Sequence, residues 1–274
     1  MRLKSVPARQ GFVWVQQGLR AFFSRPVAYA ALFASFTFSV FLLALLPAVG
    51  ALLAPMLLPL VTLAFMLATR IVIAGGMPTP SVFVAPLRAE RSRVVSMVWL
   101  GALYAVATFA VLWVSSIVDN GALDAMGAPI PAEHSTADVM AARLASPGLF
   151  IGLVLRVVLG TLISVPFWHA PALVYWDGQR CAQSLFSSTL ACWRNRGAFA
   201  VYGLTWVSLT MTFLMLASAL FALVGSPQAL GVIVVPLSGM ILMTMVYASL
   251  YFTFADSFSA NDAADVGTAN DAAV

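Results

Sequence analysis

Three polar residues with chemical potential lie within a strongly apolar part of the sequence: Arg156, His169 and Asp177. The imidazole of His169 titrates near neutral pH and could relay protons, and a charged residue inside an apolar run indicates a functional site by default. Ser164 or Ser184, together with His169 and Asp177, would supply the residue types of a catalytic triad. No nucleophile-elbow motif surrounds either serine, so the sequence favours a protein that is not an enzyme.

The elements that must position these residues are six apolar segments, each near or above the roughly 20 residues that a bilayer-crossing helix needs. They span residues 27–46, 52–73, 94–118, 149–175, 199–224 and 230–255. The chain is 62% hydrophobic and 9% charged, whereas soluble domains have about 25% charged residues. We therefore predict an all-α membrane protein with six transmembrane helices. The short loops 47–51 and 225–229 favour an arrangement as three hairpins.

Arg156 and His169 share the fourth segment but cannot form one compact site. Thirteen residues separate them, which is about 20 Å along an unbroken helix. Arg156 either lines a path or extends to the outer headgroups, and no acidic residue well inside a span is evident as its partner. His169 either lines a cavity or satisfies a backbone carbonyl freed by Pro166 or Pro171. Asp177 could approach His169 if the helix breaks at Pro171.

The distribution of basic residues predicts the orientation of the chain. Twelve of the fourteen fall on one side of the predicted topology: Arg2, Lys4, Arg9, Arg20, Arg25, Arg70, Arg88, Arg91, Arg93, Arg180, Arg194 and Arg196. Lys and Arg concentrate on the cytoplasmic side of membrane proteins, so we predict a multi-pass inner-membrane protein with both termini in the cytoplasm. Cys181 and Cys192 would then be free thiols in a reducing compartment. The basic residues form no patch, which argues against a nucleic-acid partner.

Two segments have amphipathic helical patterns but are too polar to span a bilayer. In the N-terminal segment 1–26, one predicted face carries Phe12, Val15, Leu19, Phe22 and Phe23. In the segment 180–193, one half of the helix carries Ala182, Leu185, Phe186, Thr189, Leu190 and Trp193, and the other half carries Gln183, Ser184, Ser187 and Ser188. We predict that both helices lie in the membrane interface, with docking to a partner protein as the alternative.

The remaining segments carry no predicted site. The outer loop 119–147 contains Asp119, Asp124, Glu133, His134 and Asp138, but no helical or turn spacing groups them as metal ligands. The sequence also lacks the phosphate-binding loop and the zinc-ligand motifs, so we predict neither a metal nor a cofactor. The tail 257–274 follows the transmembrane domain 27–256; it is small, polar and acidic, and is predicted to be disordered.

A stretch from Ala170 to Leu204, "APALVYWDGQRCAQSLFSSTLACWRNRGAFAVYGL", carries a resemblance. It resembles an uncharacterised family of integral inner-membrane proteins of Gram-negative bacteria, and the likeness runs from "VPARQGFVWVQQGLRAFF" to "YASLYFTFAD". The stretch is more distantly similar to the membrane domains found with some glycerophosphodiester phosphodiesterases. The shared elements are Pro171, Asp177, the helix Ala182 to Ser188, and Asn195-Arg196. The resemblance implies an all-helical membrane fold. The catalytic phosphodiesterase domain is not in this sequence, so that activity is not carried over, and the resemblance leaves the function open.

Two classes of function follow from these observations. The scarcity of polar residues inside the spans favours a non-enzymatic scaffold or accessory module that contacts the lipid bilayer and a membrane-protein partner. The broken fourth helix favours the alternative, a small-solute transporter or channel with a path past Arg156 and His169.

Overall fold

A computed structural model describes residues 1–130, 135–224 and 227–259. Six of its helices are long and apolar enough to cross a membrane: Pro26–Ala44, Ala48–Ile73, Arg91–Asp119, Pro147–Asp177, Arg196–Leu220 and Leu237–Ser257. The prediction of an all-α protein with six transmembrane helices is therefore confirmed.

The secondary-structure elements follow one another in a nearly unbroken helical series. The first half comprises β1 (Arg2–Leu3), α1 (Gln10–Ser24), α2 (Pro26–Ala44), α3 (Pro47–Ile73), the 3-10 helices η1 (Pro80–Phe83) and η2 (Ala85–Arg88), and α4 (Arg91–Asp119). The second half comprises α5 (Ala122–Gly127), α6 (Thr136–Leu144), α7 (Pro147–Phe167), α8 (Ala170–Asp177), α9 (Cys181–Arg194), α10 (Arg196–Val224), α11 (Pro227–Ser257) and β2 (Phe258–Ser259). The short helices α5 and α6 lie in the segment that the sequence predicted only as a loop.

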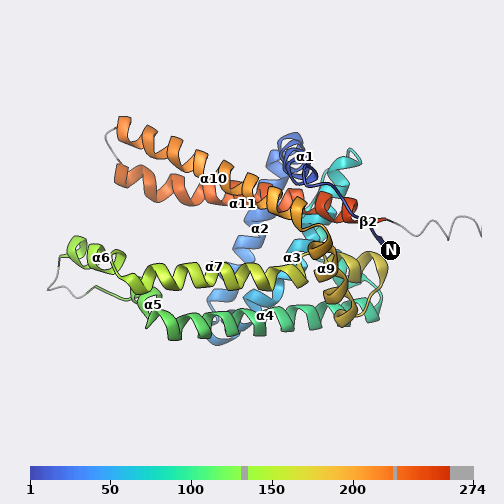
Figure 1. Cartoon of the computed structure of the whole chain (residues 1–274), viewed down its shortest axis with the longest axis horizontal. Helices are drawn as coiled ribbons and strands as arrows, with labels where there is room; N and C mark the ends of the chain where they lie inside the picture. Colours follow the sequence, from blue (N-terminus) through green and yellow to red (C-terminus); the bar gives the residue numbers. More distant parts are fainter. Residues whose placement is uncertain (131–134, 225–226, 260–274) are drawn as a thin grey trace, which may run out of the picture.

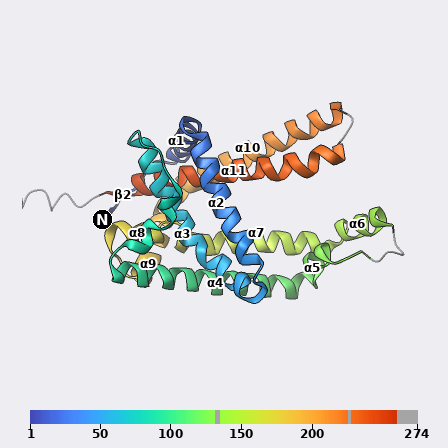
Figure 2. The same cartoon turned by 180° about the vertical axis from the view of Figure 1, so that it is seen from behind.

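The helices that do not span lie at the two ends of the molecule. Helices α1 and α9 lie, with β2, at the end that holds the N-terminus, whereas α5 and α6 lie at the opposite end (Figures 1 and 2). Each predicted hairpin partner pair is in contact, but α3 also packs against α4 and α11. The arrangement as three separate hairpins is thus unconfirmed, because α3 joins all the parts of the bundle.

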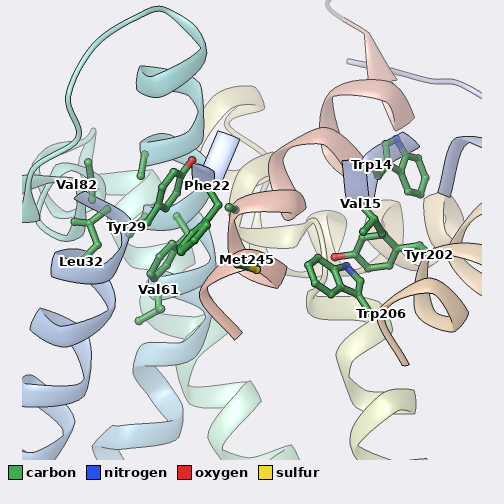
Figure 3. Close-up of a cluster of buried hydrophobic side chains, with 14 of the residues drawn as sticks. Trp14, Val15, Phe22, Tyr29, Leu32, Val61, Val82, Tyr202, Trp206 and Met245 are labelled. Atoms are coloured by element: carbon green, nitrogen blue, oxygen red, sulfur yellow. The ribbon is translucent and has the colours of Figure 1, made fainter. Parts of the chain in front are cut away.

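Helix α1 belongs to the protein core. It packs against α10 and α11, and Trp14 and Val15 are fully enclosed there beside Tyr202 and Trp206 (Figure 3). The indole Nε1 of Trp14 donates a hydrogen bond of 2.8 Å to the Asp256 carboxylate at the end of α11. Glycines at the contact let the helix approach closely, since a Cβ at Gly18 would collide with Ser249 of α11.

The buried face of α1 differs from the predicted one. Trp14 is completely buried, whereas Phe12 and Phe23, placed on the predicted apolar face, are 49% and 65% exposed. The face that packs against α10 and α11 includes small residues, among them Gly11 and Gly18, which a pattern of large apolar residues does not mark. Whether the exposed phenylalanines enter the membrane interface stays a prediction.

The two ends of the described chain are joined by a short antiparallel pair of strands. Leu3 of β1 pairs with Phe258 of β2, and the Lys4 N–H donates to the Ser257 carbonyl at 2.9 Å. The first residues of the predicted tail, 257–259, thus belong to the end of α11 and to β2. The predicted disorder of residues 260–274 lies outside the described residues.

Many large apolar side chains are exposed along the spans. Phe38 of α2, Phe150 of α7 and Leu216 of α10 are more than half exposed. A soluble protein would bury such a continuous surface, whereas lipid tails cover it in a membrane. The outer surface of the bundle thus has the character that the composition of the sequence predicts.

Candidate functional site

The fourth span breaks at His169, where α7 ends and α8 begins. Pro171 lacks an N–H group, and its ring would clash with the carbonyl four residues earlier in a continuous helix. The hydroxyl of Ser188, from α9, bridges the break. It donates to the Val165 carbonyl at 3.0 Å and accepts from the His169 N–H at 3.0 Å. Ser188 therefore supplies the hydrogen bonds that the interrupted helix has lost.

This bridge corrects the predicted role of His169. The histidine was expected to satisfy a freed backbone carbonyl, but its side chain bonds elsewhere. The Nε2 atom lies 3.3 Å from Thr253 Oγ1 on α11, and that hydroxyl donates its own hydrogen to the Leu250 carbonyl at 2.8 Å. His169 is therefore the donor in its contact with Thr253, which places the ring proton on Nε2.

The imidazole of His169 is sealed from solvent. Its exposure is 0%, and Phe199, Phe254 and Phe258 place their ring centres 5.5–6.0 Å from it. Its Nδ1 atom is buried and has no hydrogen-bond partner. The ring joins α8 to α11 by packing and by one hydrogen bond.

Asp177 does not reach His169. Its Oδ1 atom lies 2.8 Å from the amino nitrogen of Met1, and its Oδ2 atom accepts a hydrogen bond of 2.9 Å from the Gln179 side chain. The carboxylate therefore holds the N-terminal strand against the end of α8. The residue types of a triad, considered above, are not assembled around His169.

Arg156 has a partner that the sequence analysis did not find. Its Nη2 atom lies 3.6 Å from Asp119 Oδ2, and its Nε donates to Ser115 Oγ at 2.9 Å. Asp119 was assigned to the outer loop, but it is the last residue of α4 and its side chain is fully buried. Its Oδ1 atom accepts from the Gly121 N–H at 2.8 Å. The ion pair joins α4 to α7 near the ends of the two spans that lead into the segment 119–147.

A row of small residues on α7 makes room for the carboxylate. Gly148, Gly152 and Arg156 are spaced four residues apart, so they share one face of the helix. A Cβ at Gly152 would lie 2.7 Å from Asp119 Oδ2, and one at Gly148 would lie 2.8 Å from the Asp119 carbonyl oxygen. The G-x-x-x-G-x-x-x-R spacing is the signal that could have identified this contact.

Helix α9 packs with its polar side inward. Ser184 and Ser188 are buried, whereas Phe186 and Trp193 are each 69% exposed. Gln183, from the predicted polar half, is exposed as well, and Leu185, from the predicted apolar half, is half-buried. This orientation suits a helix at the membrane interface, which stays a prediction.

Both cysteines are free thiols, and both are in or at the start of α9. Burial raises the pKa of the Cys192 thiol to about 12, although a hydrogen bond with Ser188 acts in the opposite direction. Burial also raises the pKa of the half-buried Cys181. The buried Cys192 therefore lacks the environment of a reactive cysteine.

A cavity of about 260 Å³ lies between α3, α4, α7 and α11. Its lining is mostly apolar, and the side chains with polar atoms are those of Thr62, Tyr104, Ser164, Trp168 and Tyr247. Arg156, His169 and Asp177 are not among its lining residues. The three candidate residues therefore belong to three separate helix contacts.

The described residues include no group of three His, Cys, Asp or Glu side chains that could hold a metal ion. Glu133 and His134 lie outside the described residues, so the prediction of an outer loop without a metal site stays a prediction.

These features define an integral membrane protein with six spans whose charged and polar side chains join helices. The chain is 32% identical over 263 residues to a probable inner membrane protein of Burkholderia thailandensis, and the match covers 96% of each chain. The chain belongs to the family of that inner-membrane protein. No family model matches the sequence, and no solved structure matches it.

Proposed function

We propose that this protein is a non-enzymatic scaffold or accessory module of the inner membrane, with both termini in the cytoplasm. The observation that carries the proposal is the pairing of Arg156 with Asp119 across α4 and α7. An arginine that lines a transport path must be free to contact the solute. The guanidinium group of Arg156 is instead paired with the Asp119 carboxylate and hydrogen-bonded to the Ser115 hydroxyl. Its charge stabilises the bundle.

The environment of His169 supports the same function. A proton relay needs a chain of titratable groups or waters that reaches the ring. The ring is instead enclosed by three phenylalanines and bonded to one threonine hydroxyl. A rigid bundle that carries an outward-facing amphipathic helix suits a module that organises neighbouring lipids or proteins.

The more distant resemblance to the membrane domains of glycerophosphodiester phosphodiesterases fits an accessory role for envelope or lipid proteins. Two of the shared elements, Asp177 and Asn195, bind the N-terminal segment of the chain. Asp177 binds the Met1 amino group, and the Asn195 side chain bonds to the backbone of Lys4 and Val6. They carry no activity in this proposal.

One observation favours the alternative function, a small-solute transporter or channel along the fourth span. The central cavity borders α7 through Ser164 and is large enough for several water molecules. Transport would require this cavity to open to both sides of the membrane.

Thiol labelling at Ser164 separates the two functions. In a chain with Cys181→Ala and Cys192→Ala, Ser164→Cys is tested with a membrane-impermeant reagent in intact cells and in inside-out vesicles. Two exposed controls are Asp138→Cys in α6 and Arg88→Cys in η2. A scaffold leaves Ser164→Cys unlabelled from both sides, whereas labelling that a solute slows would favour transport.

The same controls test the orientation. With cytoplasmic termini, Asp138→Cys reacts in intact cells and Arg88→Cys reacts only in inside-out vesicles. The opposite pattern would overturn the proposed topology.

A further inference from the structure

We infer that a cleft at the start of α4 binds the phosphate of an anionic membrane lipid. The cleft, of about 630 Å³, lies between the first two turns of α4 and the α8–α9 turn. Arg91 lines one side and Arg180 lines the other, and Cys181 lies beside Arg180. This site is independent of the scaffold function proposed above.

The two walls of the cleft are held together by Arg93. Its Nη1 atom donates to the Tyr175 carbonyl at 2.7 Å, which joins α4 to the end of α8. The positions of Arg91 and Arg180 on opposite walls are thus fixed by the fold. Arginine side chains on two walls of one cleft suit a phosphate group, which guanidinium groups can bind through paired hydrogen bonds.

The positive charge of the cleft is not neutralised within the described part of the chain. Arg91 and Arg180 form no ion pair there, unlike Arg156. Of the carboxylates close in sequence to the two walls, Glu90 is exposed and unpaired, and Asp177 is occupied by Met1 and Gln179. An anion in the cleft could therefore bind two arginine side chains that are not already ion-paired within the described residues.

Neutral donors add to the site. Ser92 and Ser96 line the cleft, and neither hydroxyl makes a hydrogen bond within the described residues. Helix α9 begins at Cys181 without a side-chain cap, so its first N–H groups are free to face an anion. These groups supplement the arginines and would favour a phosphate that accepts several hydrogen bonds.

An apolar stripe distinguishes a lipid from a free anion as the ligand. Val95 and Trp99 line the cleft, and Leu103 continues the row at the same four-residue spacing along α4. All three are exposed, with fractions of 47%, 60% and 42%. A lipid whose phosphate lies between the arginines can lay an acyl chain along this stripe, whereas inorganic phosphate would leave it uncovered.

Cys181 provides a reporter inside the cleft. The protein with Cys192→Ala is reconstituted in nanodiscs of phosphatidylcholine, with or without phosphatidylglycerol, and the rate of maleimide labelling of Cys181 is measured. We expect phosphatidylglycerol to slow labelling about fivefold, because a bound headgroup covers the thiol in proportion to occupancy.

The matched variants are Arg91→Gln/Arg180→Gln and Arg20→Gln/Arg194→Gln, which remove equal charge at the same end of the molecule. The first pair should abolish the protection and the second should keep it, with unchanged melting temperatures in both. Native mass spectrometry of retained phosphatidylglycerol gives a second measurement that does not depend on the thiol. Equal protection in both pairs, or no protection at all, would overturn the inference, and so would equal protection by inorganic phosphate in pure phosphatidylcholine.

Discussion

Asp119 Oδ2 lies 3.6 Å from Arg156 Nη2, and the same carboxylate fills the space where a side chain at Gly152 would lie. One contact thus combines charge pairing with close helix packing. Whether Arg156 is held in this ion pair determines whether it can line a transport path or instead joins α4 to α7.

Removing either partner of this pair should destabilise the protein. Asp119→Asn or Arg156→Gln leaves an unpaired charge, and we expect a loss of about 1 to 3 kcal/mol. This is less than the roughly 3 to 5 kcal/mol for a fully buried pair because Arg156 is 27% exposed. Denaturation in mixed micelles of both single variants and the double variant gives the coupling energy. Strictly additive losses would show that the pair contributes nothing.

The glycine at the contact should tolerate no side chain. Gly152→Ala places a methyl group against the Asp119 carboxylate, so we expect a loss of about 1 to 3 kcal/mol. Gly160→Ala, two turns further along α7, is the control, since nothing lies within 4 Å of its Cβ position. The midpoint of thermal unfolding in detergent compares the two variants, and equal midpoints would contradict the packing described.

The Ser188 hydroxyl should stabilise the fold at the interruption of the fourth span. Ser188→Ala removes the bridge and leaves the buried His169 N–H and one bond of the Val165 carbonyl unsatisfied. We expect a loss of about 1 to 3 kcal/mol and faster hydrogen exchange at the His169 amide. Ser187→Ala is the control, because that hydroxyl makes no hydrogen bond within the described residues. Unchanged exchange at His169 would mean that the bridge is not formed.

The two cysteines should differ in reactivity. Burial raises the pKa of Cys192 to about 12, so almost none of it is thiolate at pH 8, whereas Cys181 is only half-buried. Maleimide at pH 8 should therefore modify Cys181 first and reach Cys192 at a comparable rate only after unfolding. Mass spectrometry of timed samples, with Cys181→Ala as the control, measures both rates. Rapid modification of Cys192 in the native protein would contradict its burial.

The sequence by itself determined the class of the protein and the number of its spans. Six apolar runs of about 20 residues leave no soluble alternative, because the backbone must satisfy its own hydrogen bonds in lipid. Pro166 and Pro171 also marked the interruption of the fourth span, since a proline removes a hydrogen-bond donor wherever the chain folds.

Only the tertiary structure decided which polar groups meet. Asp119 appeared to belong to a loop, and Ser188 lies 19 residues after His169 on another helix. Their contacts depend on how α4, α7 and α9 pack together. The spacing of Gly148, Gly152 and Arg156 marks one face of α7 but does not say which residue packs against it. The buried face of α1 was hidden for the same reason, because Gly11 and Gly18 form a contact face through their lack of side chains. Hydropathy therefore predicts the spans, whereas close packing between helices determines which charged groups pair.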